Sequence, residues 1–212
     1  MKQLIINADD YGRSDYFDRG IIEAMSQGMV TSTSVEILKC SAQAAETLKD
    51  FDVSVGLHLD LAEGDAAPQI MQQDARFKQL FGRPPTHVDG EKRCHLRDDE
   101  TKQTVADYAK SLSIPVRAHY DLDRKFFREQ GIKTADFVQS ISRLTSFQVV
   151  QNVKELKEGT TEWISHAGYY DPQYPTDRLN KEREEELKIL LSMELKAALE
   201  ENDVYLIDFR EL

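Results

Sequence analysis

Short runs of β-branched and aliphatic residues alternate along the chain with segments of helical periodicity. Runs of the first kind, bounded by turn residues, are typical of strands, and apolar residues three and four positions apart indicate helices. The pattern predicts seven strands, at residues 3–7, 30–38, 53–61, 86–89, 116–120, 162–170 and 204–209. It predicts helices at residues 14–28, 41–51, 70–81, 98–113 and 179–201, the last one broken near Ser192. Residues 121–161, which contain none of these elements, are predicted to be irregular.

Strands that alternate with helices over the whole length predict an α/β fold with a mostly parallel sheet. Polar residues gather where several of these strands end: Asp9, Asp10, His58, Asp60, Asp89, His119 and His166. Because the catalytic groups of a β/α barrel come from the carboxyl ends of several strands, the pattern favours a roughly seven-stranded β/α (TIM-like) barrel. An open, doubly wound sheet also binds ligands at its strand ends and is the alternative.

Composition and charge disfavour several classes of partner. Acidic residues outnumber basic ones by 38 to 27, and the net charge of −11 repels both nucleic acid and anionic membrane surfaces. No apolar run is long enough to cross a bilayer, and no linker rich in Gly, Ser or Pro divides the chain. Residues 1–212 are therefore predicted to form one domain. Two cysteines without zinc-type spacing, and a start without a signal-like pattern, predict a cytoplasmic protein.

The adjacent carboxylates of Asp9 and Asp10 are the first candidates for chemistry. Two like charges at a strand end repel each other unless a cation or hydrogen bonds offset them, and a divalent metal is one such cation. Because neighbouring side chains point in different directions, one carboxylate can bind the metal while the other acts as a general base. The alternative is a capping aspartate beside a solvated one. His58, opposite the apolar face of its strand, is either a ligand or a hydrogen-bonded core residue.

Four further features each allow more than one interpretation. His166 comes directly after the β-prone residues of the predicted strand at 162–170 and before a glycine, where a strand would stop, so it is a general acid, an oxyanion partner or an ordinary loop histidine. The acidic run at residues 182–187 is a metal-binding cluster or, as its helical setting favours, a solvated face. Trp163 is a core residue or a ring that stacks on a sugar. The segment PTHVDGEKRCH, residues 85–95, holds a metal or is a polar loop.

Five segments resemble, in the same order, the YdjC-like carbohydrate deacetylases, which are also called the chitooligosaccharide deacetylase family: LIINADDYGRSDYFDRGIIEAMSQGMVTSTSVEIL, VGLHLDL, PTHVDGEKRCH, SHAGYYD and YLIDFREL. The resemblance extends from the first predicted strand to the last residue. It implies an irregular β/α barrel that uses a divalent metal to remove acetyl groups from N-acetylated sugars in the cytoplasm. It also implies a small sugar substrate as the partner and a homodimer as one option for assembly.

Carried over position by position, the resemblance makes Asp9 the general base and Asp10 and His58 metal ligands. The family's third ligand is a histidine two residues after an aspartate, and Glu91 stands at that position after Asp89. His166 matches a turn histidine that protonates the leaving amine.

Glu91 in place of histidine changes the expected metal chemistry. Two carboxylates and one imidazole favour Mg²⁺, with Zn²⁺ and Mn²⁺ as alternatives, and they lower the Lewis acidity of the ion. His95 is retained four residues later as a substitute ligand, and His87 and Asp89 complete the set of candidate site residues. Two alternatives to the deacetylase stay open: a degenerate member that binds sugar or regulates a partner without catalysis, and a hydrolase of another amide or ester.

Overall fold

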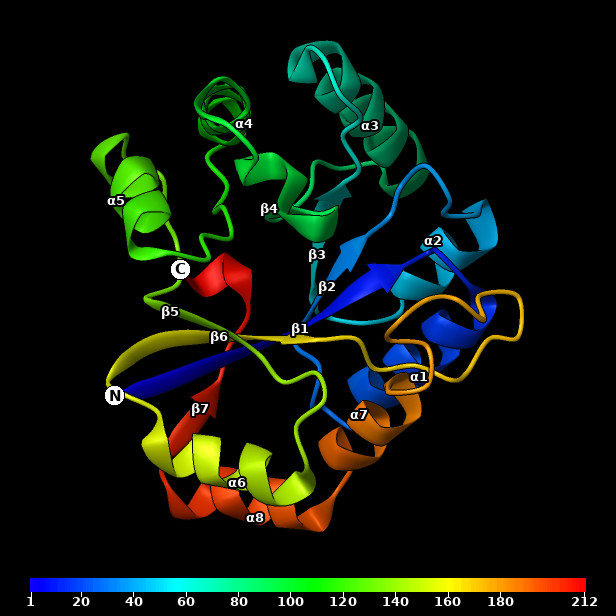
Figure 1. Ribbon diagram of the computed structural model, residues 1–212, viewed down its shortest axis with the longest axis vertical. Coiled ribbons are helices and arrows are strands. Elements are labelled where there is room, and N and C mark those ends of the chain that lie inside the picture. Colours follow the sequence, from blue (N-terminus) through cyan, green and yellow to red (C-terminus); the bar gives the residue numbers. More distant parts are fainter.

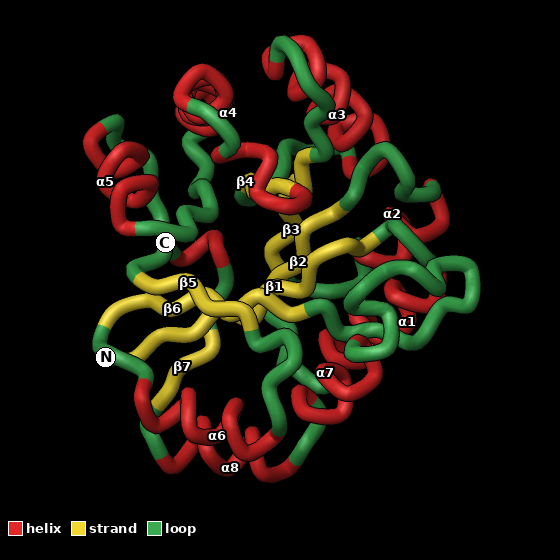
Figure 2. Tube along the Cα trace, in the orientation of Figure 1, coloured by secondary structure: helices red, strands yellow, loops and turns green.

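The computed structural model describes all 212 residues, and it is built from parallel strands connected by helices (Figure 1, Figure 2). The α/β class predicted from the sequence is confirmed. The elements follow in the order β1 (Lys2–Tyr11), α1 (Asp15–Ser26), β2 (Ser32–Val35), α2 (Ala42–Leu48), β3 (Ser54–Leu59), α3 (Ala66–Phe81), β4 (Val88–Gly90), the 3-10 helix η1 (Glu91–Leu96), α4 (Asp99–Leu112), α5 (Asp121–Glu129), β5 (Phe137–Ser140), α6 (Ser146–Glu155), β6 (Gly159–Ser165), α7 (Arg183–Leu190), α8 (Met193–Glu201), β7 (Val204–Leu206) and the 3-10 helix η2 (Phe209–Glu211).

The seven strands form one parallel sheet that curls into a half-barrel, with the helices outside it (Figure 1). The strand order is β4-β3-β2-β1-β6-β5, and β7 pairs with the first residues of β1. β1 is the central strand, because it pairs with β6 over Lys2–Ala8 and with β2 toward its carboxyl end. This curled sheet is an irregular form of the predicted TIM-like barrel, and it gathers the carboxyl ends of β1, β3 and β4 in one region.

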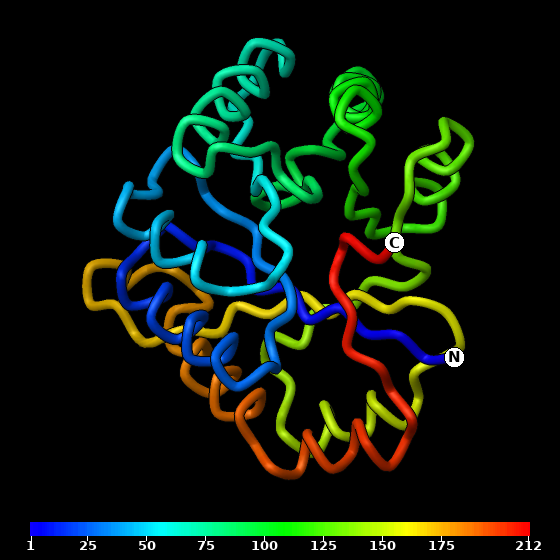
Figure 3. The backbone as a smooth tube through the Cα atoms, turned by 180° about the vertical axis from the view of Figure 1, so that it is seen from behind, coloured from blue at the N-terminus to red at the C-terminus, as the bar shows by residue number.

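The last residues of the chain pack against the amino ends of the strands, on the side of the sheet seen from behind (Figure 3). After β7 the backbone N–H of Ile207 donates to Leu4 in β1, and the ring of Phe209 stacks on His87 with 3.9 Å between centroids. Ile5, Ile207 and Phe209 form a small apolar cluster separate from the main core. The C-terminal segment therefore lies away from the carboxyl ends, where the polar residues gather.

Two predictions about secondary structure are wrong. Residues 116–120 do not form a regular strand: Val116 makes a single parallel bridge to Val88, and the next residue, Arg117, directs its side chain to buried acids. The stretch 121–161, predicted as irregular, contains α5, β5 and α6. These elements are short, and β5 is a partly exposed edge strand, so their apolar periodicity is weak.

Helix boundaries follow the predicted capping residues. Ser14 caps α1 by accepting from the N–H of Tyr16, and Gly28 follows its end with a φ of 70°. Ser192 caps α8 and separates it from α7, as expected from the predicted break. Trp163 in β6 is fully buried, so its interpretation as a core residue is confirmed. None of the helices combines the length and apolar character that crossing a bilayer requires.

Candidate active site

The end of β1 sends its two adjacent aspartates in different directions. The pairing with β2 is irregular between Ala8 and Tyr11, and Asp10 adopts a left-handed backbone with a φ of 71°. This conformation costs a non-glycine residue about 1–2 kcal/mol, so neighbouring contacts must hold it in place. As a result Asp10 lines a cavity at the carboxyl ends of the strands, whereas Asp9 is bonded within the interior.

Asp10, His58 and Glu91 converge from three elements, and we call them the convergent triad. Oδ1 of Asp10 and Oε2 of Glu91 lie 3.8 Å and 3.6 Å from Nε2 of His58. One potential ligand atom from each residue lies within 4.8 Å of the other two. Asp10 belongs to β1, His58 to β3 and Glu91 begins η1 after β4. The structure thus brings together the three residues predicted to bind metal, whose role as ligands stays a prediction.

The donor set of the convergent triad fits a divalent ion. Nδ1 of His58 lies 2.7 Å from Oδ1 of Asp89, and this bond leaves Nε2 facing the carboxylates of Asp10 and Glu91. Metal-binding histidines are oriented in the same way, by a carboxylate on the far ring nitrogen. Burial would lower the pKa of His58, but Asp89 and Glu91 raise it well above its usual value. The contact with His58 in turn lowers the pKa of Glu91 to about 2.

Arg117 joins three carboxylates beneath the convergent triad. Its guanidinium donates two bonds of 2.7 Å to Asp9, and it contacts Asp89 at 2.8 Å and Glu162 at 2.5 Å. Burial would raise the pKa of Asp89, but Arg117 and His58 hold it far below its usual value. Arg117 was not among the residues predicted for the site. The available signal was an arginine inside an apolar run, which requires buried acidic partners.

Two more arginines approach Asp10. Nη2 of Arg183 pairs with Oδ2 of Asp10, and the fully buried guanidinium stacks 3.7 Å from the ring centroid of Phe17. Nη1 of Arg13 lies 3.8 Å from the other carboxylate oxygen, Oδ1. Burial would raise the pKa of Asp10, but Arg183 and the nearby histidines hold it well below its usual value. Asp10 is therefore ionised, with Arg183 on one oxygen and His58 facing the other.

The acidic run at residues 182–187 is not wholly solvated, so that part of the prediction is wrong. Arg183 and Glu186 are buried, because the start of α7 packs under the end of β6. Oε2 of Glu186 accepts 2.7 Å from the backbone N–H of His166 and 3.2 Å from the Ser165 hydroxyl. The sequence of such a run does not show which of its side chains face inward, because their burial depends on the elements that pack against the helix.

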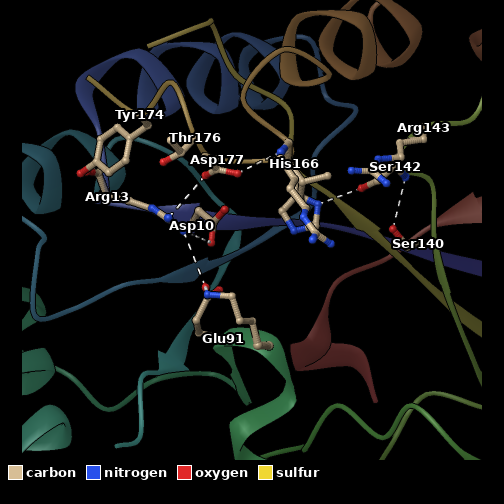
Figure 4. Close-up of a pocket in the computed structure, with 13 residues that line it drawn as sticks. Asp10, Arg13, Glu91, Ser140, Ser142, Arg143, His166, Tyr174, Thr176 and Asp177 are labelled. Atoms are coloured by element: carbon tan, nitrogen blue, oxygen red, sulfur yellow. Dashed lines mark hydrogen bonds and ion pairs between the residues drawn. The ribbon is translucent and has the colours of Figure 1, made fainter. Parts of the chain in front are cut away.

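His166 faces the cavity, which has a volume of about 720 Å³ (Figure 4). Its Nδ1 lies 2.9 Å from the hydroxyl of Ser142, so Nε2 is the ring nitrogen left for a ligand. Most of the residues that line the cavity carry polar or charged groups, which can form hydrogen bonds with a hydrophilic molecule. The lining consists of Asp10, Arg13, Glu91, Lys92, Ser140, Ser142, Arg143, His166, Tyr174, Thr176, Asp177, Arg178 and Leu179.

The structure does not bring His87 or His95 to the convergent triad. His87 lies between Ser34 and the ring of Phe209, and burial lowers its pKa to about 3. Nε2 of His95 lies 3.0 Å from the carbonyl oxygen of Arg117, and burial lowers its pKa to about 4. Both histidines are fully buried neutral groups whose bonds run to the interior. The segment PTHVDGEKRCH thus supplies Glu91 to the triad and core residues elsewhere.

The family model described as YdjC-like protein matches residues 3–74 and 67–201, which together span most of the chain. The chain belongs to the YdjC-like protein family. Asp10 in β1, His58 in β3 and Glu91 after β4 all lie within the matched residues.

A curated relative resembles this YdjC-like protein over nearly its whole length. A chitooligosaccharide deacetylase from Serratia marcescens is 28% identical over 254 residues, with 100% of this chain and 99% of the relative covered. The aligned length exceeds the length of this chain, so the alignment contains gaps where the relative has additional residues.

Solved structures share the fold of this YdjC-like protein. A protein from Enterococcus faecalis V583, described as a candidate cellobiose-phosphate cleavage protein, superposes with a TM-score of 0.83 at 23% identity. The match covers 99% of this chain and 98% of that protein's chain. A peptidoglycan N-acetylglucosamine deacetylase, crystallised with a hydroxamate ligand, gives a TM-score of 0.60 at 12% identity, covering 99% and 86%. At these identities the likeness concerns the fold alone.

Proposed function

We propose that this YdjC-like protein is a metal-dependent hydrolase that removes acetyl groups from N-acetylated sugars in the cytoplasm. The observation that carries the proposal is the convergence of Asp10, His58 and Glu91 at a polar cavity. The full-length relative named chitooligosaccharide deacetylase supports the reaction and the class of sugar.

Asp10, His58 and Glu91 would hold the ion through two carboxylate oxygens and Nε2 of the imidazole. When bound, a divalent ion supplies Lewis acidity, which polarises the acyl carbonyl and makes a water molecule easier to deprotonate. Because oxygen donors dominate the set, we propose Mg²⁺ as the ion, with Mn²⁺ and Zn²⁺ as alternatives.

Asp9 is the proposed general base. Arg117 takes one lone pair from each oxygen of its carboxylate, and the amide of Asn7 donates 2.7 Å to Oδ1. Each carboxylate oxygen accepts two hydrogen bonds, so Oδ2 keeps a lone pair that can accept a proton. His166, with Nδ1 engaged by Ser142, is the proposed general acid that protonates the leaving sugar amine through Nε2.

A non-catalytic sugar-binding protein is the second candidate. It is favoured by the arginines, because Arg183 and Arg13 already offset the charge of Asp10 without a metal. In that case the acids of the cavity would take part in ion pairs rather than in catalysis.

Calorimetric titration of chelator-treated protein with Mg²⁺, Mn²⁺ and Zn²⁺, followed by assay of acetate released from N-acetylglucosamine oligomers, tests the proposal. We expect saturable ion binding and ion-dependent release. Asp10→Asn should lose both, whereas Asp60→Asn, an exposed control at the end of β3, should keep both. If the parent protein neither binds an ion nor releases acetate, the non-catalytic candidate is supported. Ion binding without release from any N-acetylated sugar would point to another amide or ester.

A further inference from the structure

Arg13 occupies an unusual position at the edge of the convergent triad. Its Nη1 lies 3.8 Å from Asp10 and 3.8 Å from Glu91, and its Nη2 lies 3.4 Å from Asp177 (Figure 4). Nη1 also donates 3.2 Å to Glu36. The side chain is 16% exposed and lines the cavity. A permanent positive charge thus borders both carboxylates of the triad.

The hydrogen-bond donors of Arg13 are mostly unused. A guanidinium has five N–H donors, and Arg13 makes one hydrogen bond, to Glu36. Its Nε is buried without any partner, its contacts with Asp10 and Glu91 are longer than hydrogen bonds, and its contact with Asp177 is a long ion pair of 3.4 Å. Arg117, in contrast, uses all three of its nitrogens on carboxylates. Arg13 therefore retains donors at the cavity that a ligand oxygen can take up.

The carboxylate of Glu91 lowers the positive charge available at the acyl oxygen, and Arg13 can supply it. Hydrolysis of an acyl group places negative charge on the acyl oxygen, and donors fixed in advance at that oxygen are among the largest contributions to catalysis. Two carboxylates in the triad leave less net positive charge for that oxygen than one carboxylate and two imidazoles would. A guanidinium beside both carboxylates supplies positive charge that does not depend on the ion.

We propose that Arg13 is a catalytic residue that binds the acyl oxygen of the substrate, and this inference rests on the proposed function. Water adds to the acyl carbon, its proton passes to Asp9, and the carbonyl electron pair moves onto the oxygen that Arg13 contacts. When that pair returns, the C–N bond breaks, and His166 gives its proton to the departing nitrogen. The products are acetic acid, which ionises to acetate, and the free amine; the proton taken up by Asp9 replaces the one that His166 gave, and Arg13 stays protonated throughout.

Glu36 is the positioning residue for this arginine. It follows the end of β2, it is 3% exposed, and one of its oxygens accepts from Arg13 while the other pairs with Lys39. Arg13 is thereby held from a neighbouring strand of the same sheet. Glu36→Gln should leave Arg13 charged but less firmly held.

The test compares Arg13→Gln and Arg13→Lys with Arg19→Gln, a control that removes the same charge from the exposed side of α1. With saturating ion, Arg13→Gln should lower kcat for acetate release about 10²–10³-fold with little change in KM. Arg13→Lys keeps the charge and should lose less, Glu36→Gln should fall between the parent and Arg13→Gln, and Arg19→Gln should match the parent. Titration should show the ion bound by Arg13→Gln at least as tightly as by the parent, because a nearby positive charge has been removed.

Two results of the assays with substrate and ion would overturn the inference, and a third comes from acetate binding. One is a kcat for Arg13→Gln within twofold of the parent. The other is an ion that binds Arg13→Gln but not the parent, since Arg13 would then be a substitute for the ion.

Calorimetric titration with sodium acetate separates this inference from the proposed function. If the parent releases no acetate from any sugar, the proposed function fails. Acetate should still bind the parent at least about fivefold more tightly than Arg13→Gln. Equal binding would show that Arg13 does not bind the acyl oxygen.

Discussion

The carboxylate of Asp89 lies 2.7 Å from Nδ1 of His58 and turns the other ring nitrogen toward Asp10 and Glu91. This contact is the means by which a fully buried acid controls an atom at the cavity. Asp89 is also bonded to Arg117, so its own orientation is fixed from below.

Asp89→Asn should therefore weaken binding of Mg²⁺ by about 10–100-fold, the usual effect of losing the group behind a histidine ligand. The amide cannot stabilise the same ring orientation as strongly as a carboxylate does. Calorimetric titration measures the effect, and Asp60→Asn, at the exposed position directly after β3, serves as the control. Equal affinities for the two variants would show that Asp89 does not orient the ligand.

Glu91→His should change the ion preference of the protein. A second imidazole replaces a carboxylate, so the site becomes richer in the nitrogen donors that zinc favours. We expect the ratio of the Zn²⁺ to the Mg²⁺ binding constant to rise at least about tenfold. The matched control is Glu100→His, at an exposed position on α4. An unchanged ratio would mean that Glu91 is not a ligand.

Arg183→Met should make the stability of the protein depend on divalent ions. The variant leaves the buried carboxylate of Asp10 without its closest cation, and breaking a buried ion pair costs about 3–5 kcal/mol. An ion bound to Asp10 would offset part of that loss, so saturating Mg²⁺ should raise Tm more in Arg183→Met than in the parent. Thermal unfolding with and without the ion measures this, with Arg19→Met as the control. The same rise in both proteins would contradict the expectation.

Asp18 should make the fold less stable as the pH rises. It is buried in α1 and accepts 2.7 Å from the backbone N–H of Gly12, and burial raises its pKa to about 7. Between about pH 4 and pH 7 the folded protein keeps a proton that the unfolded chain has released, so the free energy of unfolding falls across this window. The total loss is at most about 4 kcal/mol, reached above pH 7.

Asp18→Asn keeps the acceptor oxygen for Gly12 and removes the charge. Its Tm should therefore exceed that of the parent by an amount that grows from pH 5 to pH 8. Asp15→Asn, at an exposed position on the same helix, should show no such growth. A constant Tm difference for Asp18→Asn at both pH values would show that Asp18 is already ionised in the fold at low pH.

The local pattern of the chain was enough to predict the parallel α/β class, most strands and the helix caps. Apolar runs, capping serines and the glycine after α1 act within a few residues, so the sequence displays them directly. The residues of the convergent triad followed from the ends of predicted strands together with the family resemblance. That His58 and Glu91 lie beside Asp10 follows from parallel strands ending at the same edge of one sheet.

The tertiary structure alone decided which charges are partners. Arg117, Arg183 and Arg13 lie 108, 173 and 3 positions from the aspartates that they approach. Only Arg117, inside a short apolar run, is set apart by its local sequence, and that run does not show which acids it pairs with. The tertiary structure also decided that His87 and His95 belong to the core, because their partners, the ring of Phe209 and the carbonyl oxygen of Arg117, come from segments distant in the sequence. The sequence by itself determines the local conformations and the chemical groups. Distances between charges depend on the packing of the whole sheet, and so the electrostatics of the site could be known only from the fold.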